Sequence, residues 1–234
     1  MSTKPKSAPP RPAPRLYLAT PVVEDPSALV TVLADLLDGS DVAAVLVRLA
    51  RTDERTMTER AKRLVSPIQR ADVACLLDGQ FLLDGNVAIV ARAGADGAHL
   101  TGIEALQEAL PTLKPERIAG VGGLITRHDA MLAGESGIDY VLFGEVDADG
   151  KRPSIEAIAE RLQWWAELFE PPCVGFAATL DEAGVFAAAG ADFVLVGDLV
   201  WSDPRGPRAA LMDARQAIGQ NPDGTFGRAL AQNV

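Results

Sequence analysis

Eight short apolar runs, separated by segments with helical spacing, constrain the fold of this chain more than any other feature of its sequence. The runs lack the polar alternation of a half-exposed strand, so they are typical of strands buried on both faces. They lie at residues 15–20, 42–49, 73–78, 97–102, 117–123, 140–146, 173–178 and 193–200. Eight such strands in 234 residues predict one α/β domain, a TIM (β/α)₈ barrel over residues 15–220. A doubly wound sheet is the alternative, which the number of strands and the compact length disfavour.

A Gly-x-Asp phrase recurs at the beginning of three of these runs. Its glycine stands at positions 94, 137 and 190, and its aspartate at positions 96, 139 and 192. Since glycine adopts the left-handed conformation that ends many helices, we expect each copy to join a helix to the next strand. Each aspartate then lies at the rim opposite the catalytic face of a barrel. We predict that it forms hydrogen bonds within its turn and takes no part in chemistry.

Capping residues indicate where some of the intervening helices begin. Thr179 and Glu182 fit a capping box, in which two side chains satisfy the first free N–H groups of a helix. Asp203 and Pro204 fit an N-cap followed by proline at the first helical position. The segment 79–96 leaves room for only a short helix after the third strand.

The composition excludes several classes of function. The formal charge of −10 argues against a general nucleic-acid or anionic-membrane binder, because both need a basic surface. His99 and His128 are the only histidines, which excludes a multi-histidine metal site. Cys75 and Cys173 lie in apolar runs far apart in the sequence, so we expect buried thiols and no disulfide.

Both ends of the chain differ from the barrel between them. Residues 1–14 are rich in proline and poor in apolar side chains, which predicts a disordered tail, and residues 221–234 are expected to form a second, loose tail. No stretch reaches 18 apolar residues, and the N-terminus lacks an apolar leader. We therefore expect a cytoplasmic protein with no membrane partner.

The chemistry of a TIM barrel lies at the carboxyl ends of its strands and just beyond them. The residues that fall there are Thr20, Arg48, Arg51, Asp78, Thr101, Glu104, Gly120, Gly122, Gly123, Gly144, Glu145, Lys151, Arg152, Ala177, Ala178, Thr179, Gly197 and Asp198. The glycines would let a ligand approach the backbone, or they only make room for turns.

Several of the carboxylates and cations in this set suggest a site for an anionic ligand. Asp78 and Glu104 follow neighbouring strands, where hard oxygen ligands suit Mg²⁺; the alternative is that both are solvated loop acids. Arg48 ends an otherwise apolar strand, so it is either functional or paired with a carboxylate such as Asp78. Lys151 and Arg152 lie in the segment DADGKRP, which is also typical of a solvated loop.

The order of these motifs resembles thiamine phosphate synthase and its TenI-type relatives. The matching segments are RLYL, the arginine of VLVRLA, GADGAHL, GIDYVLFG and GADFVLVGDL, spread over residues 15–204. Enzymes of this family join a pyrimidine diphosphate to a thiazole phosphate, and Mg²⁺ assists the departure of pyrophosphate. The resemblance therefore implies a role in thiamine biosynthesis, with a small phosphorylated substrate and no nucleic acid as partner.

The resemblance also implies roles for individual residues. Arg48 would contact the pyrophosphate, Arg51 would stand in for a lysine of the family motif, and Lys151 would steady a phosphate. Asp78 and Glu104 would hold Mg²⁺. The remaining substrate contacts would come from Gly122, Gly123, Gly144, Ala177, Ala178, Gly197 and Asp198.

The phosphate motifs depart from the family pattern and leave a second hypothesis open. Ala177-Ala178 replaces a Gly-Gly pair, and Asp198 replaces a serine. An ionised carboxylate about 4 Å from a phosphate would cost several kcal/mol at an effective dielectric near 20. The chain is then either a working synthase with altered motifs or a homologue without this activity that binds another small ligand or a protein partner. The second hypothesis predicts Asp198 inside the barrel mouth, paired with a ligand or with a base such as Arg152 or Arg205.

The adjacent residues Trp164 and Trp165 bear on the oligomeric state. Neighbouring positions of a helix point in different directions, so at least one ring faces away from the barrel. This arrangement makes a homodimer conceivable.

Overall fold

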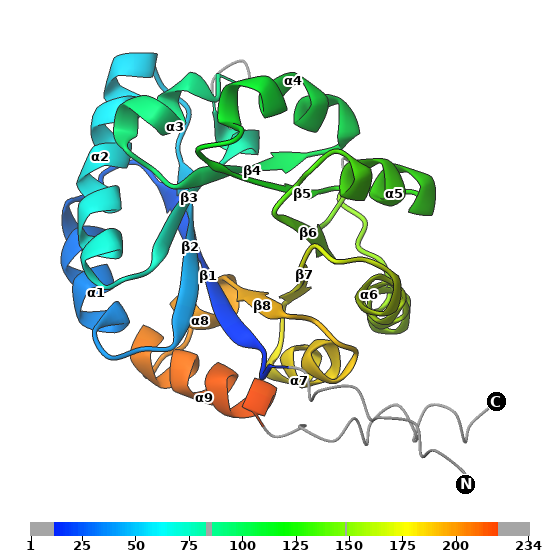
Figure 1. The fold of residues 1–234 in the computed structure, drawn as a ribbon. Coiled ribbons are helices and arrows are strands. Elements are labelled where there is room, and N and C mark those ends of the chain that lie inside the picture. The colour runs from blue at the N-terminus through cyan, green and yellow to red at the C-terminus, as the bar shows by residue number, and fades with distance from the viewer. Residues whose placement is uncertain (1–11, 83–85, 148, 220–234) are drawn as a thin grey trace, which may run out of the picture.

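The predicted strands form a closed barrel of parallel strands in the computed structural model, which describes residues 12–82, 86–147 and 149–219 (Figure 1). The strands are β1 (Arg15–Val23), β2 (Val42–Leu49), β3 (Ala74–Asp78), β4 (Gly97–Thr101), β5 (Ile118–Gly122), β6 (Tyr140–Phe143), β7 (Cys173–Ala177) and β8 (Phe193–Val196). They follow one another around the barrel in chain order, and β8 closes it by pairing with β1, where Leu16 lies opposite Val194. The fold is therefore the TIM barrel that the sequence predicts, and the doubly wound alternative is wrong.

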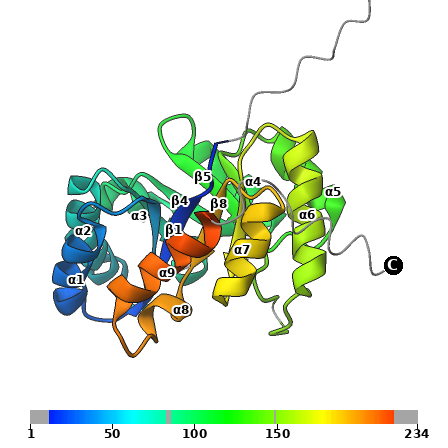
Figure 2. The ribbon, with the colours of Figure 1, turned by 90° about the horizontal axis from the view of Figure 1, so that it is seen from below.

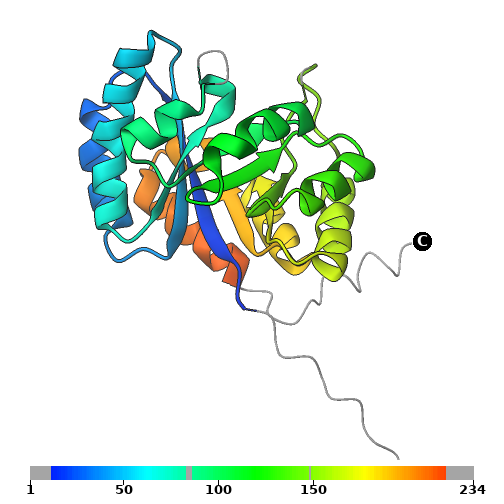
Figure 3. The same ribbon diagram turned by 45° about the horizontal axis from the view of Figure 1, so that its top comes forward.

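The helices form an outer layer around these strands (Figures 1 and 3). They are α1 (Ser27–Leu37), α2 (Glu54–Arg70), α3 (Ala88–Ala93), α4 (Ile103–Leu113), α5 (Arg127–Glu135), α6 (Ile155–Leu168), α7 (Leu180–Ala188), α8 (Asp198–Trp201) and α9 (Pro207–Gly219), with a 3₁₀ turn η1 at Gly79–Phe81. The expected short helix after β3 is α3. Helix α9 lies between α7 and α1 and completes the ring (Figures 1 and 2).

The core has two layers, one between strands and helices and one inside the barrel. The inner layer consists of Tyr17, Ala19, Leu46, Leu76, Tyr140, Leu142, Val174 and Leu195. Both cysteines are fully buried in the outer layer as thiols that form no disulfide with each other, as expected. Burial raises the pKa of the Cys75 thiol, which keeps it in the unreactive protonated form.

The glycine of each Gly-x-Asp phrase ends a helix or its turn in the left-handed conformation. The φ angles are 76° at Gly94, 82° at Gly137 and 98° at Gly190, which confirms the predicted joints. The phrase occurs a fourth time before β2, at Gly39-Ser40-Asp41, and Gly39 has a φ of 66°. The joint therefore precedes every even-numbered strand.

The aspartates of the three predicted copies bond to the neighbouring strand, so the expectation of bonds confined to their own turn is wrong. Each aspartate N–H donates to a carbonyl of the preceding strand, and its carboxylate accepts the N–H of the same residue. We call this two-bond contact a hook. The hooks join Asp96 to Cys75, Asp139 to Ala119, and Asp192 to Cys173. Asp41 instead forms an ion pair with the Arg15 side chain of β1.

Two predicted boundaries near the C-terminus are wrong. The run 193–200 is not one strand, because β8 ends at Val196 and α8 begins at Asp198. Asp203 does not cap a helix, because its carboxylate accepts the N–H of Arg205 in a turn and α9 begins at Pro207. Only half of the predicted capping box forms: Thr179 caps α7 by accepting the N–H of Glu182, but the Glu182 carboxylate accepts the N–H of Ala178 and not that of Thr179. The two predicted tails lie mostly outside the described residues.

Candidate active site at the barrel mouth

Arg48 and Asp78 lie together at the carboxyl ends of β2 and β3. Leu46 and Leu76 belong to the inner layer, so the residues two positions further along each strand also face the inside. The guanidinium Nε of Arg48 is 3.6 Å from Asp78 Oδ2, so the pairing that was one of the two alternatives for Arg48 is present. A Cβ placed on Gly197 would be 3.9 Å from Arg48 Nη2, so the same guanidinium also lies beside the end of β8.

Asp78 is the more buried member of this pair. Its side chain is 8% exposed, and its Oδ1 accepts the N–H of Gln80 at 3.0 Å. Burial raises the pKa of Asp78, while the charges of His99 and Arg48 act in the opposite direction. Positive charge brought into the mouth would therefore stabilise its carboxylate form.

A chain of hydrogen bonds crosses the inside of the barrel and ends at this mouth. The Tyr17 and Tyr140 hydroxyls are 3.0 Å apart, and Tyr140 lies 3.0 Å from Nδ1 of His99. His99 Nε2 is 3.2 Å from Glu145 Oε1. Burial alone would lower the pKa of His99, but the charge and hydrogen bond of Glu145, with the charge of Asp78, raise it above its usual value. The two tyrosines have raised pKa values because they are buried, so both keep their protons.

Arg152 forms a second polar centre behind the mouth. Its Nε donates to the carbonyl of Gly144 at 2.7 Å and its Nη2 to the carbonyl of Phe176 at 2.5 Å. Its Nη1 and Nη2 also bind the two oxygens of Glu182, at 2.9 and 2.8 Å. Of the loop pair, Lys151 is exposed as a solvated loop predicts, but the solvated-loop interpretation of Arg152 is wrong.

The Arg152–Glu182 pair also affects the predicted phosphate amides. Glu182 Oε2 accepts the N–H of Ala178 at 2.8 Å. This amide is therefore occupied by a carboxylate of the chain itself, and Ala177 is buried. An incoming phosphate would gain the Ala178 N–H only after Glu182 has moved.

Asp198 does not lie where the second hypothesis places it. It begins α8 as an exposed residue, and among the described residues its carboxylate has no hydrogen-bond or ion-pair partner. Arg205 pairs with Asp203 and Asp213, and Arg152 pairs with Glu182. The predicted pairing of Asp198 with either base is wrong, so its charge projects into solvent.

The other predicted residues occupy the rim of the mouth. Arg51 is exposed and donates to the carbonyl of Gln80 at 2.9 Å. Gly123 and Gly144 have φ angles of 63° and 104°, which suit glycine. Lys151 is held through its backbone, which exchanges hydrogen bonds with Asp147.

The donors for a divalent cation are carboxylates of two neighbouring strand ends. Asp78 lies at the end of β3, and Glu104 is exposed in the first turn of α4, directly after β4. In the part of the chain that the structure describes, no cluster of three or more acidic, histidine or cysteine side chains could hold a metal. Mg²⁺ does not need such a cluster, since it commonly takes one or two carboxylates with water and substrate phosphates. The donor chemistry therefore fits Mg²⁺ bound together with a phosphorylated substrate.

Several polar residues of the site were not predicted. His99 lies inside the GADGAHL segment and Tyr140 inside GIDYVLFG, where both pass for scaffold residues. Glu182 was predicted only as a capping residue. A histidine at an inward position of an apolar strand, two residues before the strand end, is the signal that could have revealed the chain of hydrogen bonds.

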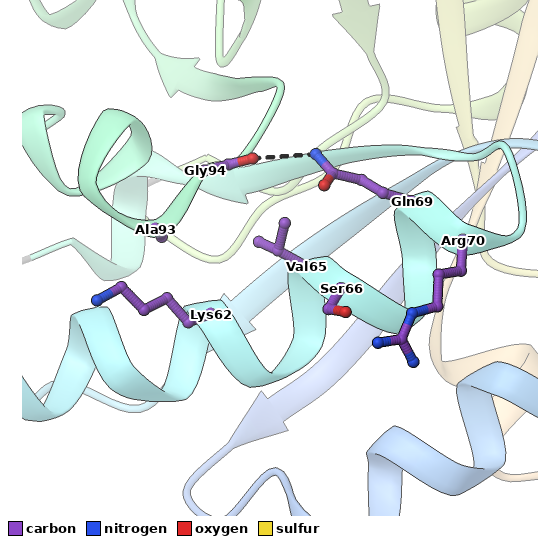
Figure 4. Close-up of a pocket in the computed structure, with 7 residues that line it drawn as sticks. All are labelled: Lys62, Val65, Ser66, Gln69, Arg70, Ala93 and Gly94. Atoms are coloured by element: carbon purple, nitrogen blue, oxygen red, sulfur yellow. Dashed lines mark hydrogen bonds between the residues drawn. The ribbon is translucent and has the colours of Figure 1, made fainter.

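The barrel mouth is distinct from a surface groove of about 460 Å³ beside α2 and the end of α3 (Figure 4). Lys62 and Arg70 line this groove, and Gln69 bonds there to the carbonyl of Gly94 at 3.0 Å. Gly94 precedes β4, so the groove lies toward the opposite rim of the barrel. It shares no residue with the candidate site.

The sequence model of the family described as thiamine monophosphate synthase matches residues 16–200. The chain belongs to this family. A thiamine-phosphate synthase of Rhodospirillum centenum is 38% identical over 87% of the chain and 97% of the relative. Another, from Hyphomonas neptunium, is 35% identical over 88% of the chain and 94% of the relative. The resemblance seen in the motifs is thereby confirmed.

Solved structures of related fold agree with the barrel of this thiamine monophosphate synthase family member. The thiamine phosphate pyrophosphorylase of Pyrococcus furiosus superposes with a TM-score of 0.69, at 23% identity over 88% of the chain and 96% of that structure. The 3-hexulose-6-phosphate synthase of Salmonella typhimurium gives a TM-score of 0.63, at 17% identity over 88% and 99%. Among the described residues, no helix has the length and apolar character needed to cross a membrane.

Proposed function

We propose that this chain is a thiamine phosphate synthase, which joins a pyrimidine diphosphate to a thiazole phosphate and releases pyrophosphate. The observation that carries the proposal is the 38% identity, over 97% of its length, to a relative named thiamine-phosphate synthase. The exposed position of Asp198 supports it further, because its carboxylate does not fill the mouth. The alternative of a homologue without this activity has no comparable support.

The reaction breaks a C–O bond of the pyrimidine diphosphate, and its electron pair leaves with pyrophosphate. The ring nitrogen of the thiazole then forms the new C–N bond to the pyrimidine methylene. Arg48 at the mouth and Arg51 at the rim would bind the diphosphate, since a guanidinium matches phosphate oxygens in charge and geometry. Fixed positive charge there stabilises the negative charge that develops on the leaving group.

Asp78 and Glu104 would hold Mg²⁺ with the diphosphate. When bound, the ion supplies further positive charge to the leaving group. It would also favour the ionised form of the buried Asp78 carboxylate, whose ion-pair partner among the described residues is Arg48. Removal of Mg²⁺ with a chelator should therefore abolish turnover.

The thiazole phosphate would bind on the side of the mouth formed by the end of β8, away from the Glu145 carboxylate that follows β6. Gly197 presents backbone without a side chain there, and Lys151 lies on the loop after β6. Arg48 reaches the same side beside Gly197. The Ala177–Ala178 amides contribute only if Glu182 releases Ala178.

Two further expectations accompany this proposal. The chain would act in the cytoplasm, and it would form a homodimer through a face that includes α6. Trp164 of α6 is half-buried, packs on Phe169 with ring centroids 5.2 Å apart, and carries the Arg127 guanidinium over its ring. Light scattering would measure the mass in solution and test the dimer.

An activity assay tests the proposed function. Purified protein with Mg²⁺ and both phosphorylated precursors should form thiamine phosphate, measured by oxidation to its fluorescent thiochrome. Arg48→Ala and Asp78→Ala should each lower kcat/KM by about 100-fold or more, the order expected when a preorganised charge is removed. Arg70→Ala, at the opposite rim, serves as the control and should keep full activity. The assignment is overturned if no product forms and neither precursor shifts Tm, or if both mouth variants remain fully active.

A further inference from the structure

Glu145 ends the buried chain of hydrogen bonds with one oxygen bonded and one oxygen free. Because a carboxylate oxygen accepts, His99 Nε2 must carry a proton toward Glu145 Oε1 in either protonation state of the imidazole. The bond at the other side of the ring, through Tyr140 to Tyr17, fixes the plane of the imidazole. Tyr17, His99 and Tyr140 are all buried, so Glu145 is held by a packed support.

The second oxygen of this carboxylate has no partner within the described residues. Glu145 Oε2 is inaccessible to solvent and accepts no hydrogen bond. A buried acceptor without a donor is unfavourable, and such groups in folded proteins usually have a function or a missing partner. The Glu145 side chain as a whole is 28% exposed, so a turn of its carboxylate would bring this oxygen to a donor from outside the chain.

Gly122 makes room for this oxygen. A Cβ at position 122 would lie 1.9 Å from Glu145 Oε2 and 3.0 Å from His99 Nε2. Any other residue would therefore displace the carboxylate or break its bond to His99. Gly122 at the end of β5 is therefore the residue that allows Glu145, after β6, to hold its carboxylate in this position.

The chemistry of this position selects one of the two substrates. Glu145 needs a hydrogen-bond donor, and its charge disfavours the phosphate groups of either substrate. The pyrimidine half of thiamine carries an exocyclic amino group, which has two N–H donors, whereas the thiazole half has no N–H. Arg48 and Asp78, on β2 and β3 of the same mouth, leave the diphosphate a separate place.

We propose that Glu145 Oε2 accepts a hydrogen bond from the exocyclic amino group of the pyrimidine, so that Glu145 recognises this ring and positions it for reaction. This inference rests on the proposed synthase function. The same bond would draw electron density from the amino group into the ring, which stabilises positive charge on the methylene carbon as the C–O bond breaks. His99 acts as a positioning residue that holds Glu145.

The test compares two ligands on the same protein by titration calorimetry. One is the aminopyrimidine diphosphate, and the other is the analogue with hydrogen in place of the amino group. The unmodified chain should bind the amino compound about 10- to 100-fold more tightly, as expected for a hydrogen bond to a charged group. Glu145→Gln, which presents an amide in place of the carboxylate, should reduce this ratio to less than about threefold. Glu160→Gln, an exposed glutamate paired with Arg127, is the matched control and should preserve it.

The possible outcomes separate this inference from the function on which it rests. Equal binding of both ligands to the unmodified chain, or an unchanged ratio in Glu145→Gln, overturns the role of Glu145 even if thiamine phosphate is formed. A high ratio that depends on Glu145, without turnover, supports recognition and overturns the synthase proposal. A third outcome is that Mg²⁺ alone binds the unmodified chain but not Glu145→Gln, while the ratio of the two ligand affinities is the same in both proteins. Glu145 Oε2 would then be a metal ligand, and the inference fails. The ligand comparison on the unmodified chain does not depend on the folding of any variant.

Discussion

Replacing Arg152 with alanine should strongly destabilise the barrel, because its guanidinium joins three elements. Arg152 bonds to carbonyls at the ends of β6 and β7 and to both oxygens of Glu182 in α7. Its side chain is 19% exposed and that of Glu182 is 8% exposed. The variant would leave Glu182 as a buried carboxylate whose remaining donor is the N–H of Ala178.

The expected magnitude follows from this unpaired charge. Removing one partner of a buried ion pair typically costs about 3–5 kcal/mol. For a domain of this size, each kcal/mol lowers Tm by about 2–4 °C, so the loss is roughly 6 to 20 °C. Urea denaturation would give the free energy of unfolding, and calorimetry would give Tm. In the double variant Arg152→Ala/Glu182→Gln, no buried charge is left unpaired, so at least half of the loss should be recovered.

Arg205→Ala is the matched control, because this arginine also pairs with carboxylates, those of Asp203 and Asp213, but is 58% exposed. It should cost no more than about 1 kcal/mol. If Arg152→Ala costs as little as Arg205→Ala, or if the double variant is no more stable than Arg152→Ala, the reasoning from an unpaired buried charge is refuted.

The same ion pair predicts a dependence on pH. Burial alone would raise the pKa of Glu182, but the hydrogen bonds from Arg152 and Ala178 outweigh it and lower the pKa. A lowered pKa in the folded state means that the pair contributes fully above the usual glutamate pKa of about 4.3 and loses its contribution as the pH falls through the folded value. The difference in Tm between the unmodified chain and Arg152→Ala should therefore narrow below about pH 4.

Two further predictions concern glycines and hooks. Gly122→Ala should break the His99–Glu145 contact and lower the free energy of unfolding by about 1–3 kcal/mol through overpacking. Gly184→Ala lies inside α7, where the nearest atom would be 3.5 Å from the new Cβ, so it should raise the free energy of unfolding by up to about 1 kcal/mol. Equal effects of the two variants in urea denaturation would contradict this reasoning. Asp192→Ala should cost about 1–3 kcal/mol because it removes the carboxylate oxygen that accepts the Cys173 N–H, and Asp192→Asn, which keeps an oxygen, should cost less. A smaller loss for alanine than for asparagine would show that the hook is not stabilising.

The barrel could be predicted from the sequence, because apolar runs and glycines in the left-handed conformation determine the structure of short, continuous segments. The strand near residue 193 shows the limit of this approach. Leu199, Val200 and Trp201 continue the apolar run, yet they form α8, and Trp201 Nε1 donates to the carbonyl of Ala19 at 2.7 Å. A short apolar run does not distinguish a strand from a buried helical turn.

The polar pairs of the site were less accessible, because their partners lie far apart along the chain. Arg48 and Asp78 lie at the ends of the adjacent strands β2 and β3, and their pairing was one of two alternatives that the strand ends suggested. Arg152 lies in a loop whose composition suggests solvent, and its partner Glu182 is 30 positions away. His99 and Glu145 are separated by 46 positions. Such contacts depend on the closed order of the strands and on side-chain direction, which composition does not supply.

The hooks occur at alternate junctions between neighbouring strands of the barrel. The junctions between β3 and β4, β5 and β6, and β7 and β8 carry an aspartate hook, and β1 and β2 are joined by the Arg15–Asp41 ion pair. No odd-numbered strand is preceded by a Gly-x-Asp phrase. The barrel wall thus consists of four pairs of strands. Within each pair, a side-chain contact joins the two strands at the rim opposite the mouth. A circular permutant opened between two such pairs, for example before β5, would keep both partners of every contact within a continuous segment. A permutant opened between β3 and β4 would instead place Cys75 and Asp96 at opposite ends of the chain.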